Sequence, residues 1–88
     1  MRYFSENEPV YLTHTYGGHH KFYDMIPDVE NNVWVAVWGK INTYGQMKIY
    51  SANEWSKKLD EKLNKGYDIV DFSYGNYNRD EVIEMMKE

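Results

Sequence analysis

The apolar residues of this chain fall into short runs that predict strands, and a long run lies at the centre. Residues 33–38 read Val-Trp-Val-Ala-Val-Trp, which is typical of a strand covered on both faces or of one whose outer face binds a ligand. Gly39 ends the run, and Asn42 and Gly45 are residue types that tolerate a positive φ. Residues 46–50 then alternate as a returning strand, so the segment predicts a hairpin.

A second hairpin is predicted before the first. Residues 8–15 alternate between apolar and polar positions, with His14 on the apolar side, and residues 20–26 continue as a strand after the Gly17-Gly18 turn. Residues 67–74 predict a fifth strand.

The clearest helix follows the central hairpin. Ser51 and Glu54 have the spacing of a capping box, and Gly66 is a natural residue just after a helix end. Apolar residues recur at helical spacing and form one stripe for packing on the sheet: Ala52, Trp55, Leu59 and Leu63.

A shorter helix is predicted over residues 78–88, because Asn78 and Glu81 repeat the capping-box spacing. The pattern as a whole predicts an α+β fold: a small, predominantly antiparallel sheet packed by one main helix, with a short C-terminal helix. The 88 residues fit a single domain with a core over about residues 8–75.

Composition excludes several classes of protein. The chain has no cysteine, which rules out disulfides, thiolate catalysis and Cys-ligated zinc. Hydrophobic residues at 42% and aromatic residues at 17% indicate a packed globule rather than a disordered chain. No apolar run approaches the roughly 20 residues that span a bilayer, and no signal-peptide pattern opens the chain, so we expect a cytoplasmic protein with no membrane partner.

The charge is unevenly distributed. A net charge of −4 argues against bulk attraction to nucleic acid. Residues 35–67, however, hold six lysines and three acidic residues, which gives this third of the chain a net charge of +3. The sequence therefore predicts a local basic face on an acidic protein, around the central hairpin.

Four short segments resemble the signature of the WGR domain, a module named after its Trp-Gly-Arg triplet and known from DNA-dependent poly(ADP-ribose) polymerases and assorted bacterial proteins. In chain order they are Lys21-Phe22-Tyr23, Trp38-Gly39-Lys40-Ile41, Gly45-Gln46 and Lys65-Gly66-Tyr67. The resemblance covers about residues 10–67. Two departures are Lys40, where the family has arginine, and Asn42, where it usually has glycine.

The resemblance implies an antiparallel sheet with one main helix and a binding module that is not itself catalytic. In DNA-bound WGR domains the tryptophan of the triplet lies against a sugar near a strand end, and Trp38 occupies that position. The family's arginine contacts nucleic acid and, in the polymerases, a neighbouring domain. Lys40 keeps the charge but lacks the planar bidentate fork of arginine. The terminal helix lies beyond the matched region.

Together, the residues and the resemblance predict a nucleic-acid site on the central hairpin, formed by Trp38, Gly39, Lys40, Tyr44, Gln46 and Lys48. A phosphate-contacting patch on the main helix is a second candidate, with the ordinary solvated face of a helix as its alternative: Lys57, Lys58, Lys62 and Lys65. The alternative for Trp38 is a rim residue that completes the core, and for Gln46 it is a hydrogen bond that braces the turn.

Metal binding and catalysis have little support. His14, His19 and His20, with Asp24, invite a metal hypothesis, but adjacent residues of a strand point to opposite faces and no ligand motif is present. We therefore predict no metal, no cofactor and no enzymatic activity. The expected function is binding of DNA at an end, nick or other structured site, or of RNA. The alternative is a protein-interaction module that uses the aromatic face. The sequence does not determine the oligomeric state.

Overall fold

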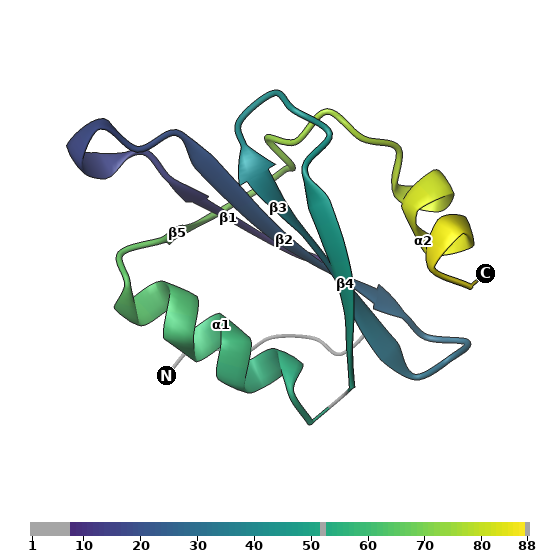
Figure 1. Cartoon of the computed structure of the whole chain (residues 1–88). Helices are drawn as coiled ribbons and strands as arrows, with labels where there is room; N and C mark the ends of the chain where they lie inside the picture. Colours follow the sequence, from purple (N-terminus) through teal and green to yellow (C-terminus); the bar gives the residue numbers. More distant parts are fainter. Residues whose placement is uncertain (1–7, 52, 88) are drawn as a thin grey trace.

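The computed structural model describes residues 8–51 and 53–87, and a five-stranded antiparallel sheet lies at its centre (Figure 1). The strands are β1 (Val10–His14), β2 (Lys21–Asp28), β3 (Val33–Lys40), β4 (Gln46–Ser51) and β5 (Asp68–Val70). Their order in the sheet is β4-β3-β2-β1-β5. The helices are α1 (Trp55–Asn64) and α2 (Arg79–Lys87), and a short 3-10 turn, η1 (Tyr16–Gly18), joins β1 to β2. This confirms the predicted α+β fold.

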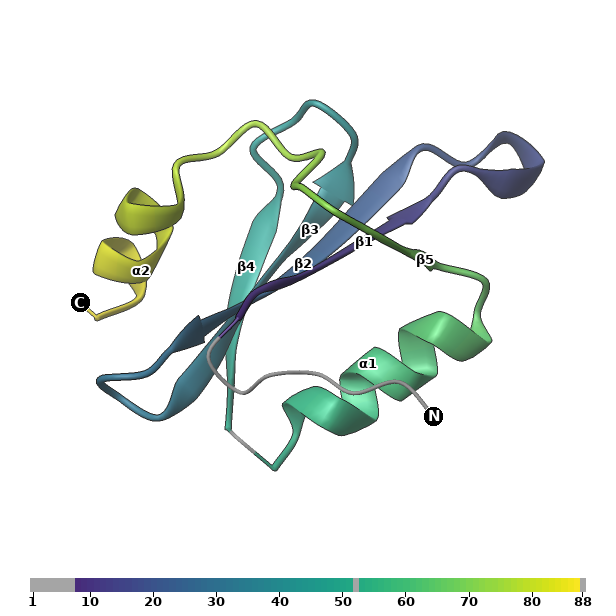
Figure 2. The ribbon, with the colours of Figure 1, turned by 180° about the vertical axis from the view of Figure 1, so that it is seen from behind.

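The two faces of the sheet are covered by different parts of the chain. Helix α1 lies against one face, and the segment from residue 71 through α2 lies over the other, as the front and back views show (Figures 1 and 2). We call these the α1 face and the α2 face. Because β2 and β3 carry apolar side chains at successive positions, both faces bury a hydrophobic core.

On the α1 face, the indole rings of Trp34 and Trp55 stack with centroids 4.2 Å apart. Leu59 packs in the same cluster. Trp38 has the same parity along β3 as Trp34 and lies on the same face, where it is only partly buried.

On the α2 face, Phe22, Ile26 and Val35 have exposed fractions of at most 1%, and Val82 of α2 is fully buried against them. The side chain of Asn78 accepts a hydrogen bond from the Glu81 N–H at 3.1 Å, so the predicted cap of this helix is confirmed. Helix α2 therefore completes a core. Residue 88 of the predicted helix lies outside the described residues.

The start of α1 differs from the prediction. The backbone of Ser51 pairs with Val33 in the sheet, so it cannot also cap a helix. The Ser51 hydroxyl hydrogen-bonds the side chain of Glu54 at 3.0 Å, and the helix begins at Trp55. The predicted capping box is thus wrong, and Ala52 of the predicted stripe lies outside the described residues.

The end of α1 agrees with the prediction. Gly66 has φ +103°, which favours glycine, and the N–H of Tyr67 donates to the carbonyl of Lys62 while that of Gly66 donates to Leu63. Strand β5, in contrast, covers only three of the eight residues predicted for it. From residue 71 the chain leaves the edge of β1 and crosses the α2 face. In the described part of the chain, no helix is long and apolar enough to cross a membrane.

Candidate nucleic-acid interface

The loop between β3 and β4 is shaped by close backbone packing. Gly45 has φ +80°, and a Cβ there would lie 2.5 Å from the Trp38 carbonyl oxygen. A Cβ on Gly39 would lie 3.0 Å from the Gly45 Cα and near the Phe22 ring. These glycines bring the two strands together on the α2 side of the hairpin.

Backbone hydrogen bonds connect this loop to the segment that follows β5. Asn42, at φ +70°, donates to the carbonyl of Tyr74 at 2.8 Å, and Asn76 donates to the carbonyl of Thr43 at 2.8 Å. The Thr43 hydroxyl also donates to the carbonyl of Lys40 at 2.6 Å. The segment after β5 thus holds the loop that positions Trp38 and Lys40.

Trp38 lies on an aromatic platform. Its ring stacks on that of the buried Tyr23, with centroids 5.8 Å apart and an interplanar angle of 23°. The Lys62 ammonium group lies 4.8 Å from the centroid of the Tyr23 ring. Trp38 therefore completes the core and also presents part of its surface in a cavity that Lys62 lines. A role in packing and a role in ligand contact are compatible for this residue.

Strand lysines contribute cations to the same face. Lys21 and Lys40 are directly opposite each other in β2 and β3. The ammonium group of Lys48 in β4 lies 5.3 Å from the centroid of the Tyr50 ring. Because the alternation of each strand is known from the pairing, all three lysines belong to the face that carries Trp38.

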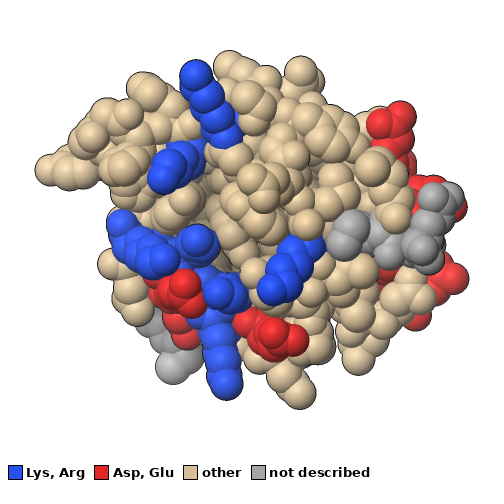
Figure 3. Space-filling model, in the orientation of Figure 1, with Lys and Arg blue, Asp and Glu red and all other residues tan. Residues whose placement is uncertain are grey.

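Helix α1 adds further lysines on its side toward the sheet, among them Lys58 and Lys62, which approach ring faces on the sheet, and Lys65. Lys57 differs, because it lies about 200° around the helix from the buried Trp55 and is exposed. Of the predicted helix patch, Lys57 is therefore the member that does not join this face. Figure 3 shows the basic side chains gathered around a hollow between the sheet and α1.

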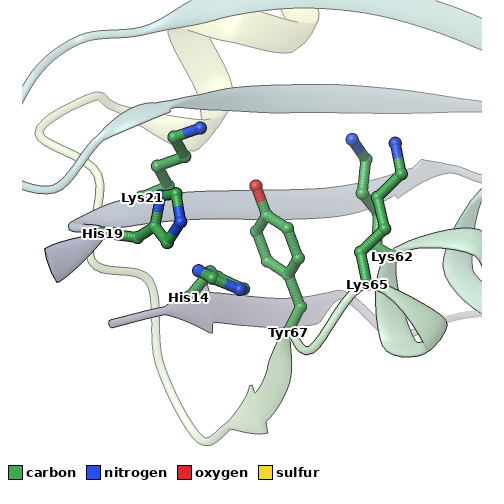
Figure 4. Close-up of a pocket in the computed structure, with 6 residues that line it drawn as sticks. All are labelled: His14, His19, Lys21, Lys62, Lys65 and Tyr67. Atoms are coloured by element: carbon green, nitrogen blue, oxygen red, sulfur yellow. The ribbon is translucent and has the colours of Figure 1, made fainter. Parts of the chain in front are cut away.

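Two adjoining cavities occupy this hollow. The larger has a volume of about 630 Å³ and is lined by Gly18, His19, His20, Lys21, Phe22, Trp38, Gly39, Lys40, Lys62 and Tyr67. The smaller has a volume of about 340 Å³ and is lined by His14, His19, Lys21, Lys62, Lys65 and Tyr67 (Figure 4). None of these described lining residues is acidic, so an anion entering the hollow meets cations and aromatic rings.

The electrostatics of α1 reflect this crowding of positive charge. Burial lowers the pKa of Lys62, and the neighbouring charge of Lys65 acts in the same direction. Glu61 lies at the helix surface and contacts Lys58 and Lys65, each at 3.5 Å. These exposed ion pairs hold the lysines weakly and leave them able to contact a phosphate.

Two residues of the predicted hairpin site, Tyr44 and Gln46, do not line the cavities. The Tyr44 hydroxyl donates to the sulfur of Met85 at 3.2 Å, so this ring is directed toward α2 and away from the cavities. Gln46 is exposed opposite Trp38 in the register, and over residues 8–51 and 53–87 its amide makes no hydrogen bond. The turn-bracing alternative for Gln46 is therefore not observed.

Of the residues that line the smaller cavity, the predicted site lacked four: His14, His19, Lys21 and Tyr67. The sequence contained an indication for His14, because this residue alternates in step with the apolar residues Val10 and Leu12 and so lies on the same face of β1. Finding Lys21 required the register that places it opposite Lys40. Tyr67 reaches the cavity because the helix end turns the chain back toward the sheet.

Asp24 lies on the α2 face of β2 and is fully buried, so it cannot join the histidines in a metal site. Its Oδ2 accepts hydrogen bonds from Ser73 at 2.5 Å and from Tyr77, while its Oδ1 has no partner among the described residues. Burial raises the pKa of this carboxyl to about 6, against the effect of the two hydrogen bonds. Among the described residues, no three His, Asp or Glu side chains are placed to hold a metal ion.

Comparisons with known proteins bear on the fold. No protein-family model matches this chain, and no curated protein matches it. A solved structure from Bacteroides fragilis, a structural genomics target, is similar with a TM-score of 0.59 and 26% identity over 72% of this chain. The match covers 19% of that chain, so this protein corresponds to about a fifth of it.

Proposed function

We propose that the α1 face binds nucleic acid, with DNA at an end, nick or other structured site as the preferred ligand. Trp38 would lie against a sugar or terminal base while the surrounding lysines contact phosphates. The observation that carries this proposal is the convergence of Lys21, Lys40 and Lys62 on Trp38 around cavities whose described lining residues include no carboxylate. The resemblance of the Trp38 triplet to that of WGR domains supports the same site.

The geometry also explains how an acidic protein would bind a polyanion. The cationic side chains surround one hollow; acidic side chains lie beside some of them, as Glu61 does on α1, and others gather at the opposite edge of the same view (Figure 3). Local potential rather than net charge governs an encounter at distances near the Debye length of about 8–10 Å. The net charge of −4 is therefore compatible with the proposal.

Fluorescence anisotropy with a labelled nicked duplex tests the proposal at about 50 and 200 mM salt. Several phosphate contacts predict a loss of affinity of about tenfold or more across this range. Lys40→Ala should weaken binding, whereas Lys57→Ala, on the far side of α1, should bind like the unmodified protein. Saturable binding that ignores both salt and Lys40 would contradict the proposal, as would no binding at low salt.

A protein-interaction module is the second candidate. Phe72 is 62% exposed and stacks on Tyr74, with ring centroids 5.0 Å apart, which leaves an apolar surface in the segment after β5. A partner bound there would dissociate little with added salt. A Phe72→Ser variant separates the two functions, since it should lose a protein partner but keep any nucleic-acid binding.

A further inference from the structure

Two histidines give the smaller cavity a chemistry that simple phosphate binding does not need. The rings of His14 and His19 lie edge to face with centroids 4.5 Å apart, and His14 also lies 5.0 Å from the Tyr67 ring. Figure 4 shows both imidazoles beside Lys21, with the Tyr67 ring between them and the two lysines of α1. Histidine is the side chain that changes charge between about pH 5 and 8.

His14 is held in place while one of its nitrogens has no partner. The atom Nδ1 is buried and makes no hydrogen bond to any described residue. The other nitrogen, Nε2, lies against the backbone of Gly66, where an added Cβ would come within 3.2 Å. A buried nitrogen without a partner is costly as a fixed structural feature, and once the ring is protonated an anion oxygen could accept a hydrogen bond from it.

The charged side chains that line the cavity beside these rings are lysines, and Glu61 of α1 lies outside the lining, 3.5 Å from Lys65. Lys21 comes from β2, and Lys62 and Lys65 come from α1. The remaining titratable group in the lining is Tyr67, whose pKa is raised by burial. Like charges oppose the addition of a proton to an imidazole, and an anion in the cavity removes that opposition.

From this geometry we infer that the cavity is an oxyanion site in which binding of a phosphate group is coupled to proton uptake by His14 and His19. The inference rests on the proposed function and adds its regulation by pH. Two protonated imidazoles beside three ammonium groups would repel one another, and the negative charge of the bound anion offsets this repulsion. Nucleic acid would therefore bind more tightly at pH 6 than at pH 8.

The test measures binding of a nicked duplex without terminal phosphates, whose charge is constant over this range, at pH 6 and 8 and constant ionic strength. Each proton taken up tightens binding by up to about tenfold per pH unit. We expect a gain of at least tenfold, a reduction of that gain below twofold in His14→Gln/His19→Gln, and its retention in Lys57→Ala, whose side chain lies on the far side of α1. Equal affinity at both pH values, or an unchanged pH effect in the double variant, overturns the inference.

A second measurement separates the inference from the proposed function. Sulfate keeps its charge over the same range, and imidazole NMR signals report protonation of each histidine. Sulfate should raise the titration midpoints of both His14 and His19. This result without DNA binding would keep the oxyanion site and reject the nucleic-acid proposal, whereas midpoints unmoved by sulfate would overturn the inference. If the double variant does not fold, His19→Gln alone replaces it.

Discussion

The two faces of the sheet use the same strands but are completed in different ways. On the α1 face, a helix that follows directly after β4 packs on Trp34, and a hollow lined by lysines stays accessible beside Trp38. On the α2 face, a segment from the end of the chain is fixed to the buried Asp24 and to the hairpin loop. One face is accessible to a ligand, and the other holds the hairpin that shapes the accessible one.

The difference shows how a small domain combines a binding surface with a rigid support. Aromatic side chains that lie half-buried on one face are fixed in place by fully buried residues on the other. If this division is correct, substitutions on the α2 face should change stability first, and substitutions on the α1 face should change binding first.

The largest expected effect comes from Phe22→Ala. This side chain is fully buried on the α2 face, and such truncations cost about 3–5 kcal/mol. Trp38→Ala removes a larger but partly exposed ring and should cost less. Urea denaturation of both variants measures the two losses. A greater loss from Trp38→Ala would break the proposed division between the faces.

Gly75→Ala should come next. An added Cβ would lie 2.6 Å from the Phe22 ring and 2.7 Å from that of Tyr77, so the crossing segment would have to move. Overpacking of this kind costs about 1–3 kcal/mol. Gly18→Ala is a control for the loss of glycine, because a Cβ there meets no atom within 4 Å, although its φ of +84° is also unfavourable for alanine. Equal thermal stability of the two variants would show that the close packing at Gly75 is unimportant.

The third prediction concerns pH. The pKa of Asp24 is about 6 in the folded protein and about 3.9 in an unfolded chain, so protonation favours the folded state. Its contribution is complete below the unfolded pKa and disappears as the pH rises through 6, which lowers the free energy of unfolding by about 1–2 kcal/mol between pH 5 and 7.5. Asp24→Asn cannot titrate and should reduce that difference. Parallel pH profiles of the two proteins would disprove the assignment.

The smallest expected effect is that of Asn78→Ala. Loss of the hydrogen bond from Asn78 to the Glu81 N–H should cost about 1 kcal/mol, because it is the cap of α2. Asn78→Ser can still accept this bond and should recover most of the stability. Thermal denaturation would measure both variants, and identical losses would indicate that the cap contributes nothing.

Local patterns were sufficient to predict much of the fold. The run of apolar residues in β3 specified a strand with two buried faces, and Asn78 and Gly66 marked helix ends that the structure contains. The fifth strand was overestimated for a physical reason. The residues after Val70 have strand-like composition, but Ser73 and Tyr77 hydrogen-bond Asp24, so the chain crosses a face instead of extending an edge.

The candidate site could be predicted only in part. Trp38, Lys40, Lys62 and Lys65, which line the two cavities, were predicted because they lie on recognisable local elements. Lys21 and Tyr67 reach the same hollow through strand register and the reversal after α1, which are long-range properties. The burial of Asp24 on the opposite face could not be predicted, because the position of a single carboxylate in a strand does not show which face it occupies or whether that face is covered.

The late position of the crossing segment has a consequence for synthesis on the ribosome. A nascent chain that has emerged to residue 70 contains all five strands and α1, yet Phe22, Ile26, Val35 and Val37 still lack their cover. Translation adds the remaining residues within a few seconds at about 5–20 residues per second. During that interval the growing polypeptide exposes an apolar surface to which chaperones and neighbouring chains can bind. The surface is buried once Val82 packs against it.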